Sequence, residues 1–144
     1  MGSRGWLRAA SVFLWIFCLG HTAGMLLGKS SGPQEDAVVR AMKDFHFDAM
    51  GRDRTLWDFW EGFNVFTSLA LATLAALVWR LGGHVRTSPG TTRSLAATLF
   101  VGTAAIAVLC WLDFFLAPAA ASTLAAASLL VAWHSLGPVR GDPS

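Results

Sequence analysis

The sequence is poor in charge. Only 14% of its 144 residues are Asp, Glu, Lys or Arg, whereas soluble proteins carry about 25%. The net charge of +2 is too small to favour a nucleic-acid partner. Hydrophobic residues make up 54% of the chain. This composition excludes an ordinary soluble domain and predicts a single integral domain in a lipid bilayer.

Cysteine is scarce as well. Cys18 and Cys110 are the only two, each lies in an apolar run, and no CxxC spacing occurs. Such cysteines usually behave as small buried hydrophobes, so we expect no metal site. His21, His84 and His134 fall at different depths of the predicted helices, which argues against a haem held by two histidines. No cofactor is therefore predicted.

What the sequence does contain is four apolar runs of the length that spans a bilayer, about 20 residues each. They cover residues 6–28, 56–81, 94–116 and 118–136. Because backbone polar groups must be satisfied inside lipid, we expect helices, and hence an all-α bundle of four transmembrane helices. The first run lacks a small-x-small cleavage site and is expected to stay in the protein. The fourth run is rich in alanine and offers a packing surface for a homo-oligomer or a membrane-complex partner.

Basic residues predict the orientation. The short loop between the second and third runs contains no acid, and the N-terminus is also basic. Basic residues favour the cytoplasmic side, so we expect both termini in the cytoplasm and a bacterial inner-membrane location. The first loop, which mixes both signs of charge, then faces outward. The basic residues concerned are Arg4, Arg8, Arg80, Arg86, Arg93 and, in the tail, Arg140.

The first loop contains a short amphipathic segment at residues 33–50. Ser31 is a candidate N-cap, Pro33 suits a first helical turn, and Gly51 suits a helix end. Apolar residues recur along one stripe, which predicts an outer amphipathic helix. This helix either covers helix ends or acts as a lid over a pocket.

The stretch "RTLWDFWEGFNVF" opens the second run with polar groups. Thr55 and Asp58 have the spacing of a capping box, which accounts for Asp58. Glu61 and Asn64 lie deeper, on one helical face with Trp57 and Ser68. A carboxylate in the membrane is costly and usually faces an interior, a cavity or a partner. Glu61 is therefore a candidate site residue.

Depth along the helices groups other polar residues with Glu61. The predicted pocket, in the outer third of the bundle, consists of His21, Glu61, Asn64 and Asp113, and its predicted lid of His46, Asp48, Arg52 and Arg54. Gly20, Gly24 and Gly28 form a GxxxGxxxG pattern that favours a close helix contact beside His21. Three interpretations remain open: a structural hydrogen-bond network, a ligand or proton site, and catalysis.

The stretches "GHTAG" at residues 20–24 and "FHFDAMGRDRTLWDFWEGFNVF" at residues 45–66, with four spans in 144 residues, resemble a family of small bacterial membrane proteins of unknown function. This resemblance implies the fold and no activity. A looser analogy links the His, acidic, Asn and Trp residues to the pocket of the EXPERA membrane proteins.

Taken together, the sequence favours a non-enzymatic accessory or small-ligand-binding membrane protein. The alternative is a membrane-embedded enzyme or a proton-coupled carrier that acts on a small lipophilic substrate through His21, Glu61 and Asp113.

Overall fold

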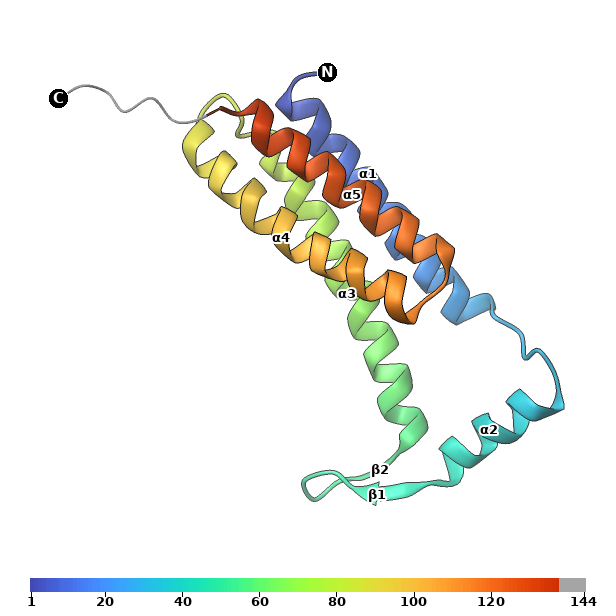
Figure 1. Cartoon of the computed structure of the whole chain (residues 1–144). Helices are drawn as coiled ribbons and strands as arrows, with labels where there is room; N and C mark the ends of the chain where they lie inside the picture. Colours follow the sequence, from blue (N-terminus) through green and yellow to red (C-terminus); the bar gives the residue numbers. More distant parts are fainter. Residues whose placement is uncertain (138–144) are drawn as a thin grey trace. The chain divides into compact units, whose positions relative to one another are not determined.

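The computed structural model describes residues 1–137, and Arg140 lies outside them (Figure 1). The chain is all-α apart from one short β-hairpin. In order, its elements are α1 (Ser3–Leu27), α2 (Pro33–Asp44), β1 (His46–Asp48), β2 (Asp53–Thr55), α3 (Leu56–Leu81), α4 (Pro89–Asp113) and α5 (Leu116–Ser135).

Four of the described helices, α1, α3, α4 and α5, are long and apolar enough to cross a membrane, so the protein is membrane-embedded. The bounds of α3 match the predicted run. Helix α4 begins at Pro89, five residues before the expected start, because proline suits a first helical position that needs no N–H donor. Helix α5 begins at Leu116, two residues before the expected start. Pro118 thus lies in the first turn of α5, where its missing N–H costs no hydrogen bond.

The chain divides into two compact units. The first, here called the bundle unit, contains the described residues 1–20 and 71–137. The second, the hairpin unit, contains residues 21–70. Helices α1 and α3 each contribute one end to each unit, so their sequences have to serve two environments.

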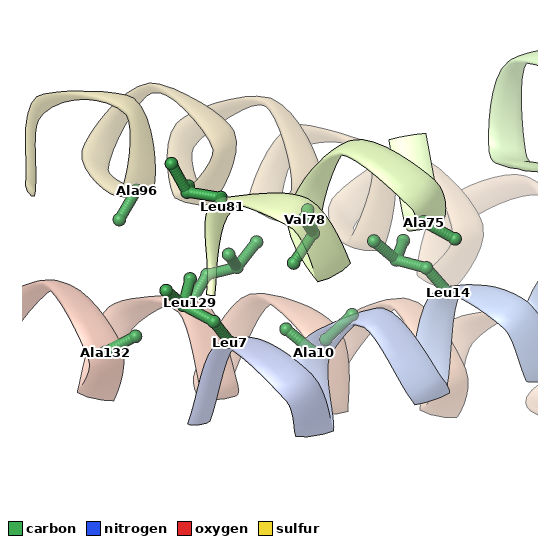
Figure 2. Close-up of a cluster of buried hydrophobic side chains, with 10 residues drawn as sticks. Leu7, Ala10, Leu14, Ala75, Val78, Leu81, Ala96, Leu129 and Ala132 are labelled. Atoms are coloured by element: carbon green, nitrogen blue, oxygen red, sulfur yellow. The ribbon is translucent and has the colours of Figure 1, made fainter. Parts of the chain in front are cut away.

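The core of the bundle unit is built from small and branched apolar side chains (Figure 2). Leu7, Leu14 and Leu129 are almost completely buried. Alanines fill the space between them and allow the helices to approach closely. All four long helices contribute; the cluster is Leu7, Ala10, Leu14, Ala75, Val78, Leu81, Ala96, Ala125, Leu129 and Ala132.

Hydrogen bonds join helices of the bundle unit. The Ser11 hydroxyl donates to the carbonyl of Ala75 at 2.7 Å, and the indole of Trp111 donates to the hydroxyl of Thr123 at 3.0 Å. Helix α5 is the most enclosed of the four long helices. In its most apolar stretch 50% of the residues are buried, against 17–22% in the other three. Its alanine-rich surface is thus used in part inside the bundle, and a homo-oligomer or membrane-complex partner on this helix stays a prediction.

The hairpin unit corrects the prediction of one helix over residues 33–50. Helix α2 ends at Asp44, and β1 and β2 pair antiparallel with His46 opposite Thr55. The expected Ser31 cap is also wrong. Gly32 is the N-cap, and the Ser31 backbone N–H instead donates to the carboxylate of Glu35 at 2.6 Å. This hydrogen bond holds the pKa of Glu35 below its ordinary value.

Gly51 does not end a helix but forms the tip of the hairpin. Ala49 and Arg52 exchange two backbone hydrogen bonds, of 2.8 and 3.3 Å. Between them Met50 and Gly51 both have positive φ, 54° and 82°. Two central residues of this kind are typical of a type I′ turn, whose twist matches that of the paired strands. The Met50 side chain is fully exposed.

Candidate functional site

The start of α3 is fixed by the capping box that the sequence predicts. The Thr55 N–H donates to the Asp58 carboxylate at 2.9 Å, and the Asp58 N–H donates to the Thr55 hydroxyl at 3.1 Å. Both side chains thereby satisfy amides that have no partner within the helix. The polar character of Asp58 is accounted for by this role.

Two polar contacts join the α1 and α3 segments of the hairpin unit. The Nε2 of His21 lies 3.2 Å from the carbonyl oxygen of Asn64, and the Thr22 hydroxyl donates to the Ser68 hydroxyl at 3.0 Å. A carbonyl oxygen can only accept, so Nε2 carries the proton in this contact. The Asn64 side chain donates to the carbonyl of Trp60 at 2.8 Å, within its own helix. His21 and Asn64 are thus brought together, through the Asn64 backbone.

Glu61 is exposed, and within residues 1–137 its carboxylate has no hydrogen-bond or ion-pair partner. It begins the second turn of α3, at the edge of the polar face that contains Asn64. Asp113 is also exposed and ends α4, where its charge opposes the helix dipole. Asp113 belongs to the bundle unit, so the hairpin unit holds three of the four predicted pocket residues.

The predicted lid residues belong to the hairpin and the strand that leads into α3. The Nδ1 of His46 lies 2.9 Å from the Asp53 carboxylate, in an exposed pair. Asp48 accepts from the N–H of Gly51 at 2.7 Å and so supports the turn. Arg52 pairs through its backbone only, whereas the Arg54 guanidinium donates to the Asp53 carbonyl at 3.1 Å.

A row of aromatic rings attaches the hairpin to α3. Phe47 lies 5.2 Å from Phe59, centroid to centroid, and Phe59 lies 6.4 Å from Phe63. In addition, the Lys43 ammonium lies 4.8 Å from the Trp57 ring, a cation–π contact. Arg54, in the strand that leads into α3, lies beside this row of rings.

The aromatic face of α3 forms a groove that the sequence did not predict. The groove has a volume of about 400 Å³ and lies within the hairpin unit. Its lining residues are Arg54, Asp58, Phe59, Gly62, Phe63 and Phe66. A Cβ added at Gly62 would meet no atom within 4 Å, so the missing side chain leaves open space. The sequence does contain one signal for this groove. Helical spacing places Phe59, Gly62, Phe63 and Phe66 on one face of α3.

Within residues 1–137 there is no group of three or more His, Cys, Asp or Glu side chains arranged to hold a metal ion. In addition, Cys18 and Cys110 are both buried.

Comparison with known proteins found no matching family model, no matching curated protein and no matching solved structure. The functional argument therefore depends on the geometry of this chain alone. The resemblance of the 20–24 and 45–66 stretches to a bacterial membrane-protein family stays a prediction.

Proposed function

We propose that this chain is a non-enzymatic multi-pass membrane protein that binds a small amphiphile at the start of α3. The groove beside Gly62 is the observation that carries this proposal. Its volume of about 400 Å³ lies in the range of small-molecule sites, about 300–1,000 Å³. Its walls are mostly aromatic, as expected for a site that holds an apolar ligand body.

The two charged residues at the groove differ in what they can offer a ligand. The Asp58 carboxylate is engaged with the helix N-terminus through the Thr55 N–H. Arg54 has five N–H donors, and its one described hydrogen bond goes to the Asp53 carbonyl. The remaining donors favour a ligand head that accepts hydrogen bonds. The ligand class is therefore an apolar chain or ring system with a carbonyl, carboxylate or phosphate head.

The polar residues at the same end support binding over catalysis. A general acid or base must lie within hydrogen-bond distance, about 3 Å between heavy atoms, of the group with which it exchanges a proton. His21 uses Nε2 in a contact with a backbone carbonyl, and the described part of the chain gives Glu61 no partner. Enzyme or carrier chemistry through His21, Glu61 and Asp113 stays the alternative, and it predicts a Glu61-dependent activity.

In this proposal the protein lies in the bacterial inner membrane with both termini in the cytoplasm, and the first loop, residues 28–55, faces outward. The acid-free, arginine-containing turn between α3 and α4 supports that orientation. A thiol-reactive, membrane-impermeant label should modify Met50→Cys in intact spheroplasts. Labelling only after lysis would contradict the orientation.

The binding proposal is tested by filling the groove. Leucine at Gly62 should occupy the open space, whereas leucine at Gly102, which is also exposed on a long helix with no atom near its Cβ, is the matched control. We expect native mass spectrometry of the gently purified protein to show a co-purifying lipid or other amphiphile. It should be lost in Gly62→Leu, weakened in Arg54→Gln and retained in Gly102→Leu.

Folding is followed in the same samples by thermal denaturation. The proposal is wrong if the wild type holds no small molecule, or if Gly62→Leu and Gly102→Leu retain it equally. A co-purifying protein lost only in Glu61→Gln would instead indicate an accessory subunit.

A further inference from the structure

A second hollow lies in the bundle unit, where the first turn of α1 meets the turn after α3. It has a volume of about 220 Å³. Its lining residues are Gly2, Ser3, Arg4, Gly82, Gly83, Val85 and Arg86. Two arginines thus lie at a small hollow lined otherwise by glycine, serine and one valine. Gly82 is buried, with the Arg8 and Leu7 side chains close to the position of a Cβ, whereas Gly83 is exposed.

Two neighbouring arginines at this end are engaged with aromatic rings. The guanidinium of Arg8 lies 3.4 Å from the centroid of the Trp79 ring, and that of Arg93 lies 5.5 Å from the Trp133 ring. Arg4 and Arg86, in contrast, are exposed and have no ring, hydrogen-bond or ion-pair partner among residues 1–137. Their guanidinium donors are available to a ligand.

Among the described residues of the bundle unit, no acid lies near these two charges. Asp113 is the only Asp or Glu among residues 1–20 and 71–137, and it ends α4. The α4 start at Pro89 follows the turn that holds Arg86. A 25-residue helix is about 37 Å long at 1.5 Å per residue. Asp113 is therefore far beyond the Debye length of about 8 Å at physiological salt.

We infer that the hollow between the start of α1 and the α3–α4 turn binds a phosphate group through Arg4 and Arg86. Guanidinium forks match phosphate oxygens in geometry as well as charge. The opening turn of α1 adds backbone amides without intrahelical partners and the positive end of its dipole. A volume of about 220 Å³ suits a phosphate-bearing head group.

Such a phosphate has two sources, an anionic lipid head group and free phosphate. Basic hollows between transmembrane helices suit anionic head groups, and this hollow lies at the ends of α1 and α3. The inference does not depend on the amphiphile groove, because the two sites lie in different units and share no residue.

The experiment titrates the full-length, delipidated protein in non-ionic detergent. Native mass spectrometry follows binding of dioleoylphosphatidylglycerol and of dioleoylphosphatidylcholine. A parallel thermal-shift series uses inorganic phosphate alone. We expect phosphatidylglycerol to bind more tightly than phosphatidylcholine. An arginine-dependent shift with inorganic phosphate, without preference for the anionic lipid, would identify free phosphate as the source.

Arginine variants test the contacts themselves. Arg4→Gln/Arg86→Gln should weaken phosphatidylglycerol binding about thirtyfold, from about 1 kcal/mol per arginine. Arg4→Lys/Arg86→Lys should restore most of the affinity. Arg40→Gln/Arg52→Gln removes two exposed charges from the hairpin unit and should change affinity less than about twofold.

Equal affinity of the wild type and the Arg4→Gln/Arg86→Gln variant, for lipid and for inorganic phosphate, would overturn the inference. So would an equal loss in the Arg40/Arg52 control. If the double variant does not fold, each single glutamine variant decides, with an expected loss of about fivefold.

Discussion

The bundle unit and the hairpin unit share helices α1 and α3 but are held together by different forces. Every buried residue of the described chain lies in the bundle unit, and none lies between residues 21 and 70. In the bundle unit α1 contributes Leu7 and Leu14 to the core, whereas beyond Gly20 it contributes His21 and Thr22 to hydrogen bonds. One helix thus changes from apolar packing to polar pairing along its length.

This difference indicates which of the two units is expected to bind a ligand. A unit with its own close-packed core resists rearrangement. A unit without buried side chains opens at low free-energy cost, and ligand-binding segments are usually of that kind. The hairpin unit contains the groove beside Gly62, exposed aromatic rings and an unpaired carboxylate at Glu61. We therefore expect its stability to depend on lipid, ligand or partner more than that of the bundle unit does.

The largest expected effect comes from a cavity in the bundle core. Leu129→Ala removes a completely buried side chain and should lower the free energy of unfolding by about 2–5 kcal/mol. The matched change Leu27→Ala, at a residue 75% exposed in the hairpin unit, should stay within about 0.5 kcal/mol. Unfolding by SDS in mixed micelles measures both. Similar losses in the two variants would erase the contrast between the units.

A smaller effect is expected from the polar pairing of the hairpin unit. His21→Ala removes the contact between Nε2 and the Asn64 carbonyl and should cost about 0.6–1.7 kcal/mol. Glu61→Gln, which changes a side chain without a described partner, should cost less than about 0.5 kcal/mol. Hydrogen exchange should accelerate at residues 56–70 in His21→Ala and stay unchanged at residues 71–81. Acceleration along all of α3 would show that the units do not open separately.

The hairpin tip should respond in the opposite direction. Met50 has a φ of 54°, a conformation that glycine adopts without strain. Met50→Gly should therefore stabilise the hairpin by about 0.5–1 kcal/mol. Met50→Ala keeps the Cβ and should give no comparable gain. Hydrogen exchange of the Arg52 amide, which bonds to the Ala49 carbonyl, reports the change. Slower exchange in both variants would mean that strain at φ is not the cause.

The smallest expected effect is a pH dependence at the start of α2. The hydrogen bond from the Ser31 N–H lowers the pKa of Glu35 in the folded protein. Its stabilisation is therefore complete above about pH 4.5, the ordinary value, and is lost as the pH falls through the lowered folded pKa. Glu35→Gln should remove this dependence, measured by exchange of the Ser31 amide. Asp36→Asn should leave it, since Ser31 bonds to Glu35. An unchanged profile in Glu35→Gln would contradict the assignment.

The sequence predicted the features that depend on local chemistry. Both ends of α3 were correct, because Thr55 and Asp58 form a capping box and glycines follow Leu81. The α2 helix was predicted too long. The helical apolar stripe continues in the sequence through Phe45 to Ala49. In the structure, however, residues 46–48 form a strand that pairs with residues 53–55, so the helix ends before them. Such pairing depends on partners several residues away, which a helical period does not reveal.

The candidate site was predictable only in part, for the same reason. Depth and helical phase predicted that His21 and Asn64 lie close together. In the structure His21 contacts the backbone carbonyl of Asn64. The groove depends instead on the space left by Gly62 between phenylalanines and on Phe47, which comes from the hairpin and contacts Phe59. The open space beside a glycine depends on how the neighbouring side chains pack in the folded protein, which the sequence alone does not reveal.

Helix α5 has a consequence for how the chain enters the membrane. Half of the residues in its most apolar stretch are buried inside the protein. Its mean hydropathy of 1.6 is below the value of 2.2 for α4. Alanine contributes little to insertion on its own compared with leucine or phenylalanine. Two residues separate α4 from α5, and the Trp111–Thr123 hydrogen bond joins them. During biosynthesis α5 is therefore expected to leave the translocon together with α4, as a helical pair whose first member supplies most of the lipid affinity.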